Sequence, residues 1–328
     1  MYIHNYYFIL YKKLNKKYII NFNKYHNYNM TTYIKPIIKW IGGKTQIIDK
    51  IIATFPNKIS NYHELFLGGG SVLLALLQNI ENKKIKVEGT INAYDINETL
   101  INLYKNIQNK YNDILLEINK ITDVFNKLDG NIICRKPNNY TEAITSQESY
   151  YYWIRKEYNK LSQEQKNSIL GSAYFIFLNK TCFRGIYRES VNGFNVPFGH
   201  YKNPEIINEE HIKKIAELIK NVNFYCLSFE KSFERINKDD FIYLDPPYAP
   251  ETNKSFVGYT SLGFTLEQHE LLFTLCKKYN FVMSNADVDL VKNNFSQDIY
   301  NIDTILCKRA INSKKPGSKT KEVIIKSN

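Results

Sequence analysis

The stretch NYHELFLGGGSVLLALLQNI, residues 61–80, and the segment GTINAYDIN at 89–97 decide the fold class. NYHELFL is typical of a buried strand that Gly68–Gly70 interrupt, and Ser71 is expected to cap the apolar helix VLLALLQNI. GTINAYDIN predicts a second strand that ends at Asp95. A strand, a glycine turn, a helix and another strand form a βαβ unit, which implies a parallel sheet.

The same alternation resumes near the other end of the chain. Strands are predicted for VNFYCLS (222–228), DDFIYLD (239–245) and FVMSN (281–285), and a helix for FTLEQHELLFTLCKKY (264–279). Between the two halves, residues 97 to about 220 are helical in pattern, with a turn-rich stretch whose NGFN segment suits a hairpin. The sequence therefore predicts an α/β fold: a Rossmann-like sheet in two chain segments, interrupted by a mainly helical insertion that contains a β-hairpin.

Length and composition bound the class of protein. At 328 residues, the chain fits two domains or one core with a large insertion, and its 44% apolar and 23% charged residues are those of a globular protein. No stretch reaches about 18 consecutive apolar residues, so no membrane span is expected. The net charge of +12 favours a polyanionic partner, but residues 1–29 contribute +5 and residues 308–328 contribute +6. The rest is nearly neutral, which weakens that inference.

The cysteines are scattered through the chain. There are five of them, an odd number, and no two form a C-x-x-C pair. This pattern favours an intracellular reducing compartment and argues against a disulfide framework and against a zinc site.

Two glycine turns suggest ligand binding. Gly42-Gly43-Lys44-Thr45 resembles the end of a phosphate-binding loop, but residue 38 is isoleucine where that motif needs glycine, which disfavours a nucleotide triphosphatase. A lysine beside a tight turn can still hold a carboxylate. Asp95 lies 25 residues after Gly70, close to the spacing of about 20 for an acid that accepts from ribose hydroxyls, so a nucleoside-type cofactor is indicated.

The tetrapeptide Asp245-Pro246-Pro247-Tyr248 follows the apolar run FIYL. Two prolines after a strand can simply end it, with an acid at the edge. However, a carboxylate and a prolyl carbonyl can both accept from one exocyclic amine, and the prolines fix the direction of that carbonyl because φ is locked. The neighbouring tyrosine ring can stack on a base. This combination predicts a site that holds an amino-purine or amino-pyrimidine.

Together these segments resemble the Dam family of DNA adenine-N6 methyltransferases, in order from about Ile34 to Ile325. The matching motifs are KWIGGK (39–44), ELFLGGGSV (64–72), YDIN (94–97), YYWIRKEYN (151–159), FLNKTCFRGIYR (177–188), FNVPFGHYKNP (194–204), DPPYAP (245–250), FTLEQHELL (264–272), MSN (283–285) and KRAINS (308–313). The resemblance implies a catalytic domain of residues 30–100 and 218–328 and an inserted DNA target-recognition domain of residues 101–217. Residues 1–29 fall outside it, and their composition, rich in Tyr, Asn, Lys and Ile, predicts a disordered tail.

The resemblance also implies a methyl donor, S-adenosyl-L-methionine (AdoMet), and the residues that bind it. The implied cofactor contacts are Trp40, Lys44, Phe66, Gly68, Gly70, Asp95 and Asp245. The implied catalytic residues are Asp245, Pro246, Pro247 and Tyr248. The target adenine would have to be flipped out of the duplex to reach them. No metal is implied.

Double-stranded DNA is the implied partner, with GATC as the expected target. The implied DNA contacts are Phe183, Arg184, Arg188, Asn195, Pro197, His200, Arg309 and Asn312. Arg188 aligns with an arginine that contacts guanine in members recognising GATC, and arginine with guanine is the commonest pairing in the major groove. The alternative is a phosphate contact or a surface charge. Arg184 and His200 stand where such members often carry Asn and Arg.

Several alternatives remain open at the level of sequence. Cytosine-N4 methylation is a rival within the same chemistry, although Ser is more usual than Asp at the start of that tetrapeptide. A DNA-binding protein that has lost catalysis is a rival from another class, and retention of Trp40, Lys44, Asp95 and the whole DPPY argues against it. The lysines of KRAINSKKPGSKTKE (308–322) are expected either to contact phosphates or to lie in a solvated loop. A monomer and a cognate restriction endonuclease as partner are further expectations.

Overall fold

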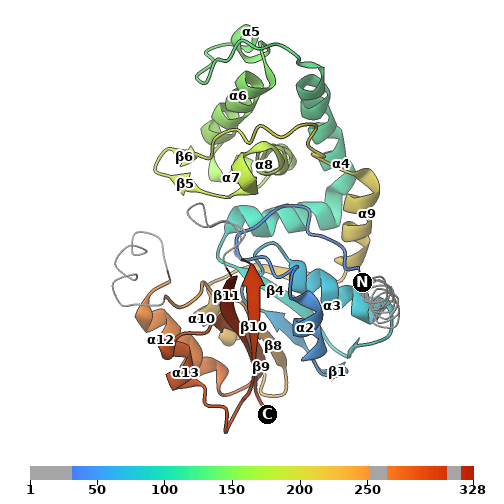
Figure 1. Cartoon of the computed structure of the whole chain (residues 1–328). Coiled ribbons are helices and arrows are strands. Elements are labelled where there is room, and N and C mark those ends of the chain that lie inside the picture. Colours follow the sequence, from blue (N-terminus) through green and yellow to red (C-terminus); the bar gives the residue numbers. More distant parts are fainter. Residues whose placement is uncertain (1–31, 251–263, 309–318) are drawn as a thin grey trace, which may run out of the picture. The chain divides into compact units, whose positions relative to one another are not determined.

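The computed structural model describes residues 32–250, 264–308 and 319–328. The chain from Ile34 onward forms one compact unit, and the fold is that of this unit (Figure 1). Arg309 and Asn312, with the rest of 309–318, lie outside the described residues.

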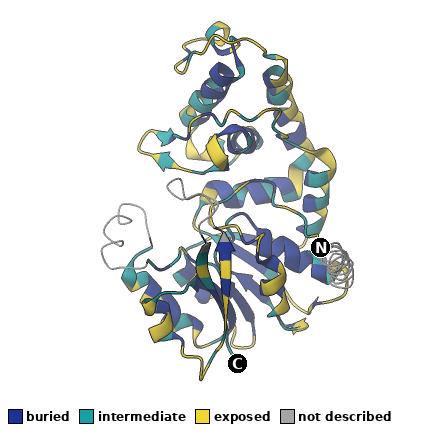
Figure 2. Ribbon diagram, in the orientation of Figure 1, coloured by how far each residue is buried: buried dark blue, intermediate teal, exposed yellow. Residues whose placement is uncertain are grey.

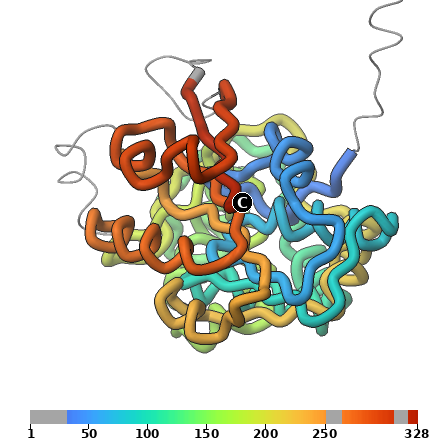
Figure 3. Tube along the Cα trace, turned by 90° about the horizontal axis from the view of Figure 1, so that it is seen from below, coloured from blue at the N-terminus to red at the C-terminus, as the bar shows by residue number. Residues whose placement is uncertain are grey.

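A seven-stranded sheet forms the centre of the unit, in the order β10-β11-β9-β8-β2-β4-β7. The strands are β2 (Tyr62–Glu64), β4 (Ile91–Asp95), β7 (Val222–Cys226), β8 (Phe241–Leu244), β9 (Asn280–Ala286), β10 (Asn301–Lys308) and β11 (Lys319–Lys326). The five from β7 to β9 are mutually parallel, and β11 and β10 add an antiparallel hairpin at one edge. A short parallel pair, β1 (Lys58–Ile59) and β3 (Lys86–Val87), lies apart from it. Figure 3 shows the Cα trace of the same chain turned by 90° about the horizontal axis.

Helices cover both faces of the sheet, as an α/β fold requires. On one face, Ile242, Leu244 and Met283 pack with aromatic residues such as Phe229 and Phe273. The covering helices are α10 (Phe229–Phe233), α12 (Leu266–Cys276) and α13 (Asp289–Asn294). On the other face lie α2 (Ile48–Ala53), α3 (Ser71–Glu81) and the first turns of α4 (Glu98–Lys127). The strands between these layers are largely buried (Figure 2), which agrees with their apolar sequences.

The long connection from β4 to β7 is mainly helical, as predicted. Its elements are α4, α5 (Tyr140–Ala143), α6 (Gln147–Lys160), α7 (Gln163–Lys166), α8 (Ile169–Thr181), the 3₁₀ turn η1 (Phe183–Gly185), β5 (Glu189–Ser190), β6 (Gly193–Phe194) and α9 (Glu209–Leu218). Helix α4 runs straight through the predicted domain limit at 100/101, and its backbone leaves helical geometry only at Lys110. Helix α4 packs on β4 and β7 of the sheet and also on α8 of the insertion. The domain limits themselves stay a prediction.

Most of the predicted elements are confirmed, and two local predictions need correction. The hairpin is present as β5 and β6, with its turn at Val191–Asn192. Ser71 is not the N-cap of α3, so that prediction is wrong: Gly70 occupies the cap in a left-handed conformation, and the Ser71 hydroxyl accepts from the backbone N–H of Lys44 instead. The predicted C-terminal tail is in part a strand, since Lys319–Lys326 form β11. Within the described ranges, no helix is long and apolar enough to cross a bilayer.

Candidate active site

Three segments meet at the carboxyl ends of the parallel strands. They are the glycine turn after β2, Asp95 at the end of β4, and Asp245-Pro246-Pro247-Tyr248 after β8. Strand β2 pairs with both β4 and β8, so the three segments are neighbours. In open α/β sheets this edge is where ligands bind.

Asp95 fastens the glycine turn to the end of β4. Its two carboxylate oxygens accept from the backbone N–H of Gly68 at 2.9 Å and of Asn97 at 2.9 Å. Burial raises the pKa of Asp95 above its usual value, and the backbone N–H groups partly oppose this. A carboxylate has about four acceptor sites, so Asp95 keeps capacity for a ligand hydroxyl.

Trp40 lies against the glycine turn. Gly68 has φ +49, and a Cβ built on it would lie 3.1 Å from Trp40 Cδ1. A side chain at this position would thus be strained by its backbone and crowded by the indole. Phe66 lies near the same turn, with its ring packed against Phe229 and Phe264 at centroid distances of 6.0 and 5.8 Å. The turn is therefore flanked by aromatic side chains.

Lys44 binds the carboxylate of the DPPY segment. Its Nζ lies 2.7 Å from Asp245 Oδ2 and 4.9 Å from the centroid of the Tyr248 ring. The Lys44 ammonium also donates to the carbonyl of Gly42 in the tight turn before it. The prediction that this lysine can hold a carboxylate is met by Asp245, and the KWIGGK segment is thereby joined to DPPY.

The two carboxylate oxygens of Asp245 differ in their contacts. Its Oδ1 is buried and has no hydrogen-bond partner among the described residues. Burial raises the pKa of Asp245 to about 6, whereas the Lys44 ammonium acts to lower it. At neutral pH Asp245 is thus mostly ionised. A buried carboxylate oxygen with no partner among the described residues is unusual, because nearly all buried polar atoms are paired.

Two residues that sequence reasoning missed hold the DPPY segment. Glu322 of β11 accepts from the Tyr248 hydroxyl at 2.8 Å. Asn285, at the end of β9, accepts from the backbone N–H of Ala249 at 3.1 Å. Asn285 belongs to the MSN motif, which was the only signal for it. Glu322 carried no signal, because its strand was taken for part of a tail. We name Lys44, Asp245, Tyr248 and Glu322 the carboxyl-end cluster.

Glu64 lies beneath this cluster on β2. It is buried, and burial raises its pKa to about 8, while the hydroxyl of Tyr62, which donates to it at 2.8 Å, acts to lower the pKa. Glu64 is therefore mostly protonated at neutral pH. This keeps a second negative charge away from Asp245.

The β5–β6 hairpin presents an exposed polar surface. Arg188 is exposed, and its Nε donates to Asn195 Oδ1 at 2.6 Å across the hairpin. Phe183 and Pro197 are also exposed, and the Phe183 N–H donates to the Pro197 carbonyl at 2.8 Å. Two bonded pairs of predicted DNA contacts thus lie within residues 183–197.

Arg184 and His200 both have left-handed backbone conformations. Their φ angles are +58 and +51, in a region that asparagine and histidine adopt more readily than arginine. His200 Nε2 also lies 3.8 Å from Glu148 Oε2, and the His200 ring packs edge-on against Phe198. The backbone at position 184 therefore suits the expected asparagine better than the arginine that this chain carries.

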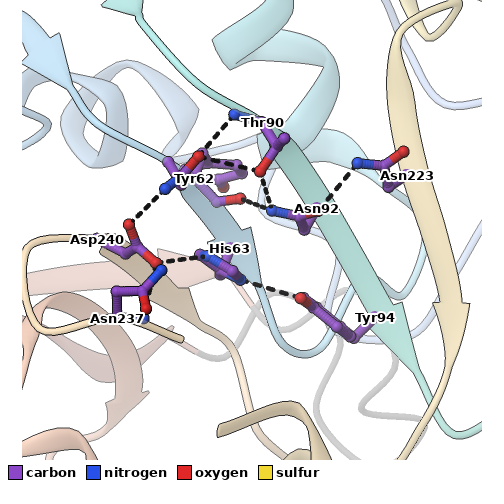
Figure 4. Close-up of polar contacts among 9 residues, drawn as sticks. Tyr62, His63, Thr90, Asn92, Tyr94, Asn223, Asn237 and Asp240 are labelled. Atoms are coloured by element: carbon purple, nitrogen blue, oxygen red, sulfur yellow. Dashed lines mark hydrogen bonds and ion pairs between the residues drawn. The ribbon is translucent and has the colours of Figure 1, made fainter. Parts of the chain in front are cut away.

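A second polar cluster lies at the opposite, amino ends of the strands (Figure 4). Asp240 accepts from Asn61 Nδ2 at 2.7 Å and contacts His63 Nε2 at 3.2 Å, and His63 Nδ1 contacts the Tyr94 hydroxyl at 3.0 Å. Asn237 adds its backbone N–H to Asp240 at 2.8 Å. We name Asn61, His63, Tyr94 and Asp240 the amino-end cluster; it borders a cavity of about 400 Å³.

The comparison with known families decides between the possible uses of this site. A model described as D12 class N6 adenine-specific DNA methyltransferase matches residues 40–311, which is most of the chain. The chain belongs to this family.

Relatives of this D12-class methyltransferase agree. The type II methyltransferase M.MjaIII of Methanocaldococcus jannaschii is 35% identical over 89% of this chain and 96% of its own length. The DNA adenine methylase of Haemophilus influenzae is 33% identical over 81% of this chain and 83% of its own. The type II methyltransferase M1.LlaDCHI of Lactococcus lactis subsp. cremoris is 29% identical over 89% and 95%.

The chain is therefore an adenine-specific DNA methyltransferase with an AdoMet-type methyl donor and DNA as its substrate. The residues fit such a donor: a glycine turn without side chains, an acid with spare acceptor capacity, and flanking aromatic rings. Among the described residues, no group of three or more His, Cys, Asp or Glu could hold a metal ion.

Proposed function

We propose that this methyltransferase modifies N6 of an adenine that has been flipped out of duplex DNA, and that its target is GATC. The observation that carries the adenine assignment is the buried Oδ1 of Asp245, which has no partner among the described residues, beside a lysine-bound Oδ2. An N–H of the substrate amine would supply the missing hydrogen-bond donor.

The DPPY segment would hold the amine through two acceptors. Asp245 Oδ1 accepts one N–H, and the carbonyl of buried Pro246 accepts the other. Tyr248 stacks on the base, and its hydroxyl, bound by Glu322, fixes the plane of the ring. Two acceptors localise the lone pair of the amine and stabilise the positive charge that develops on it. Pro247 is exposed and serves to fix the backbone.

Trp40, Phe66, Gly68, Gly70 and Asp95 would hold the methyl donor. AdoMet supplies an electrophilic methyl group next to the amine. Asp95 accepts from a ribose hydroxyl, and the indole of Trp40 offers π density to a cation. Lys44 keeps Asp245 ionised, since its ammonium lowers the pKa of that carboxyl.

The helical insertion, residues 101–217, would be the target-recognition domain. Arg188 would contact guanine in the major groove, with its guanidinium held in plane by Asn195. Phe183 and Arg184 of η1, which precedes the hairpin, are exposed and would enter the duplex beside the flipped base. As in a type II restriction-modification system, a cognate restriction endonuclease would be the partner of this methyltransferase.

Methyl transfer from labelled AdoMet to two matched duplexes tests this proposal. One duplex carries GATC and the other a single-base variant of it, and a nucleoside digest identifies the labelled base. Label on adenine in GATC alone is the expected result. Label on cytosine would refute the adenine assignment, and equal label on both duplexes would refute the target.

A further inference from the structure

Asn179 joins two segments that carry different functions. It lies near the end of α8 with 1% of its surface exposed. Its Oδ1 accepts from the backbone N–H of Lys39 at 2.8 Å, and its Nδ2 donates to the carbonyl of Lys39 at 2.9 Å and of Gly185 at 3.1 Å. Lys39 directly precedes Trp40 of the cofactor-side loop, and Gly185 lies at the root of the hairpin that carries Arg188.

Two independent contacts bring the same segments together. The rings of Trp40 and Tyr187 stack at a centroid distance of 5.2 Å with 22° between their planes. Gly185 has φ +64, and a Cβ on it would lie 2.5 Å from Lys39 Cδ. Only glycine fits this turn without displacing the loop. The hairpin is therefore packed directly against the Lys39–Lys44 loop.

We propose that Asn179 is a positioning residue that sets the recognition hairpin in register with the cofactor-side loop. Its carboxamide is the only side-chain group on the described residues shown to bond the backbones of both segments at once. Aspartate lacks the donor, and alanine leaves the N–H and the carbonyl of Lys39 and the buried carbonyl of Gly185 without their partner. This inference rests on the proposed function, because the two segments are assigned there to cofactor binding and target recognition.

Because Asn179 would position both segments, its loss is expected to weaken AdoMet binding and target discrimination together. In Asn179→Ala, the Kd for AdoMet, measured by calorimetry without DNA, is expected to rise about tenfold. The ratio of kcat/KM between the cognate duplex and its single-base variant is expected to fall by a similar factor. Asn179→Ser, which keeps a hydroxyl beside Lys39, is expected to lose less of both in the same proportion.

Asn106→Ala is the matched control. Asn106 likewise bonds three groups of a distant segment, donating to Asn167 O at 2.8 Å, Ser168 O at 3.3 Å and Ser172 Oγ at 2.9 Å. Within the described residues, the hydrogen bonds of Asn106 reach neither functional segment. We expect it to lower the melting temperature while leaving the Kd and the ratio within twofold of wild type.

The proposal is overturned if the Asn179 variants change only stability, or only one of the two readouts. Asn179→Ser decides the question where the alanine variant is not recovered folded. Wild-type protein that binds AdoMet but methylates no duplex would refute the proposed function. In that case the Kd still reports on Asn179, and an unchanged Kd would refute the positioning role separately.

Discussion

The two ends of one parallel sheet carry two polar clusters that differ in how fully they are paired. At the amino end, Asp240 receives three hydrogen-bonding groups and is 2% exposed. At the carboxyl end, Asp245 has one oxygen on Lys44 and one buried oxygen with no partner among the described residues. A paired network is stable in itself, whereas an unpaired acceptor costs free energy until a ligand arrives.

The difference in pairing distinguishes the structural cluster from the functional one, and the size of a neighbouring cavity is not needed for this distinction. The cavity of about 400 Å³ lies at the amino end, but the polar atoms of the cluster beside it largely satisfy one another. At the carboxyl end, by contrast, Asp245 Oδ1 has no partner among the described residues. Thr122 Oγ1 is likewise buried with no partner among the described residues, so incomplete pairing indicates the reacting centre only together with the position of Asp245 at the carboxyl ends of the strands.

Replacing the two aspartates gives the largest expected contrast. Asp245→Ala removes the acceptor for the amine, so kcat is expected to fall about 10³-fold or more, while duplex binding stays within about tenfold because the hairpin is intact. Methyl transfer under saturating AdoMet and a duplex-binding titration measure the two effects. Wild-type kcat in this variant would remove Asp245 from the mechanism.

The corresponding change at the amino end is expected to act on stability. Asp240→Ala leaves Asn61, His63 and the N–H of Asn237 without their common acceptor, which costs about 3 kcal/mol of unfolding free energy. Urea denaturation measures this loss. The kcat per folded molecule is expected to stay within about threefold of wild type, and a loss like that of Asp245→Ala would erase the distinction between the clusters.

The pH dependence of kcat is expected to follow the carboxyl-end cluster alone. Burial raises the pKa of Asp245 to about 6, and only the ionised form accepts from the amine. The rate is therefore expected to rise with pH through about 6 and to fall about tenfold per unit below it. Single-turnover rates between pH 5 and 8 measure this limb.

Two variants sharpen that pH test. Lys44→Met removes the ammonium that lowers the pKa of Asp245, so the acid limb is expected to move upward. Burial lowers the pKa of His63 below its usual value, and this residue belongs to the amino-end cluster. His63→Gln should therefore leave the limb in place, and a shift in this variant would assign the titration to the wrong end of the sheet.

The sequence was sufficient for the parts whose chemistry is local. The βαβ unit, the hairpin and the DPPY segment each depend on neighbouring residues, and the strand ending at Asp95 is where it was predicted. The cap at Ser71 was mispredicted because Gly70 adopts the left-handed conformation and frees the hydroxyl for Lys44.

Contacts between distant segments could not be predicted in this way. Glu322 reaches Tyr248 across 74 residues, and Asn179 reaches Lys39 across 140. Strand β11 alternates charged and apolar residues only in part, so its pairing with β9 and β10 was not evident from the basic composition around it. Which buried acceptor remains unpaired is a property of the whole fold.

Removing one tyrosine hydroxyl from each cluster is the smallest change and the closest match. The Tyr248 hydroxyl donates to Glu322 at 2.8 Å, and the Tyr94 hydroxyl contacts His63 Nδ1 at 3.0 Å. Tyr248→Phe keeps the stacking ring but frees its orientation, so kcat is expected to fall about fivefold, equivalent to about 1 kcal/mol. Tyr94→Phe is expected to cost about 1 kcal/mol of unfolding free energy with kcat unchanged. Parallel denaturation and kinetics on both proteins check this pair. If Tyr94→Phe slowed methyl transfer as much as Tyr248→Phe, the two clusters would be coupled through β2 and β4, and pairing would no longer distinguish them.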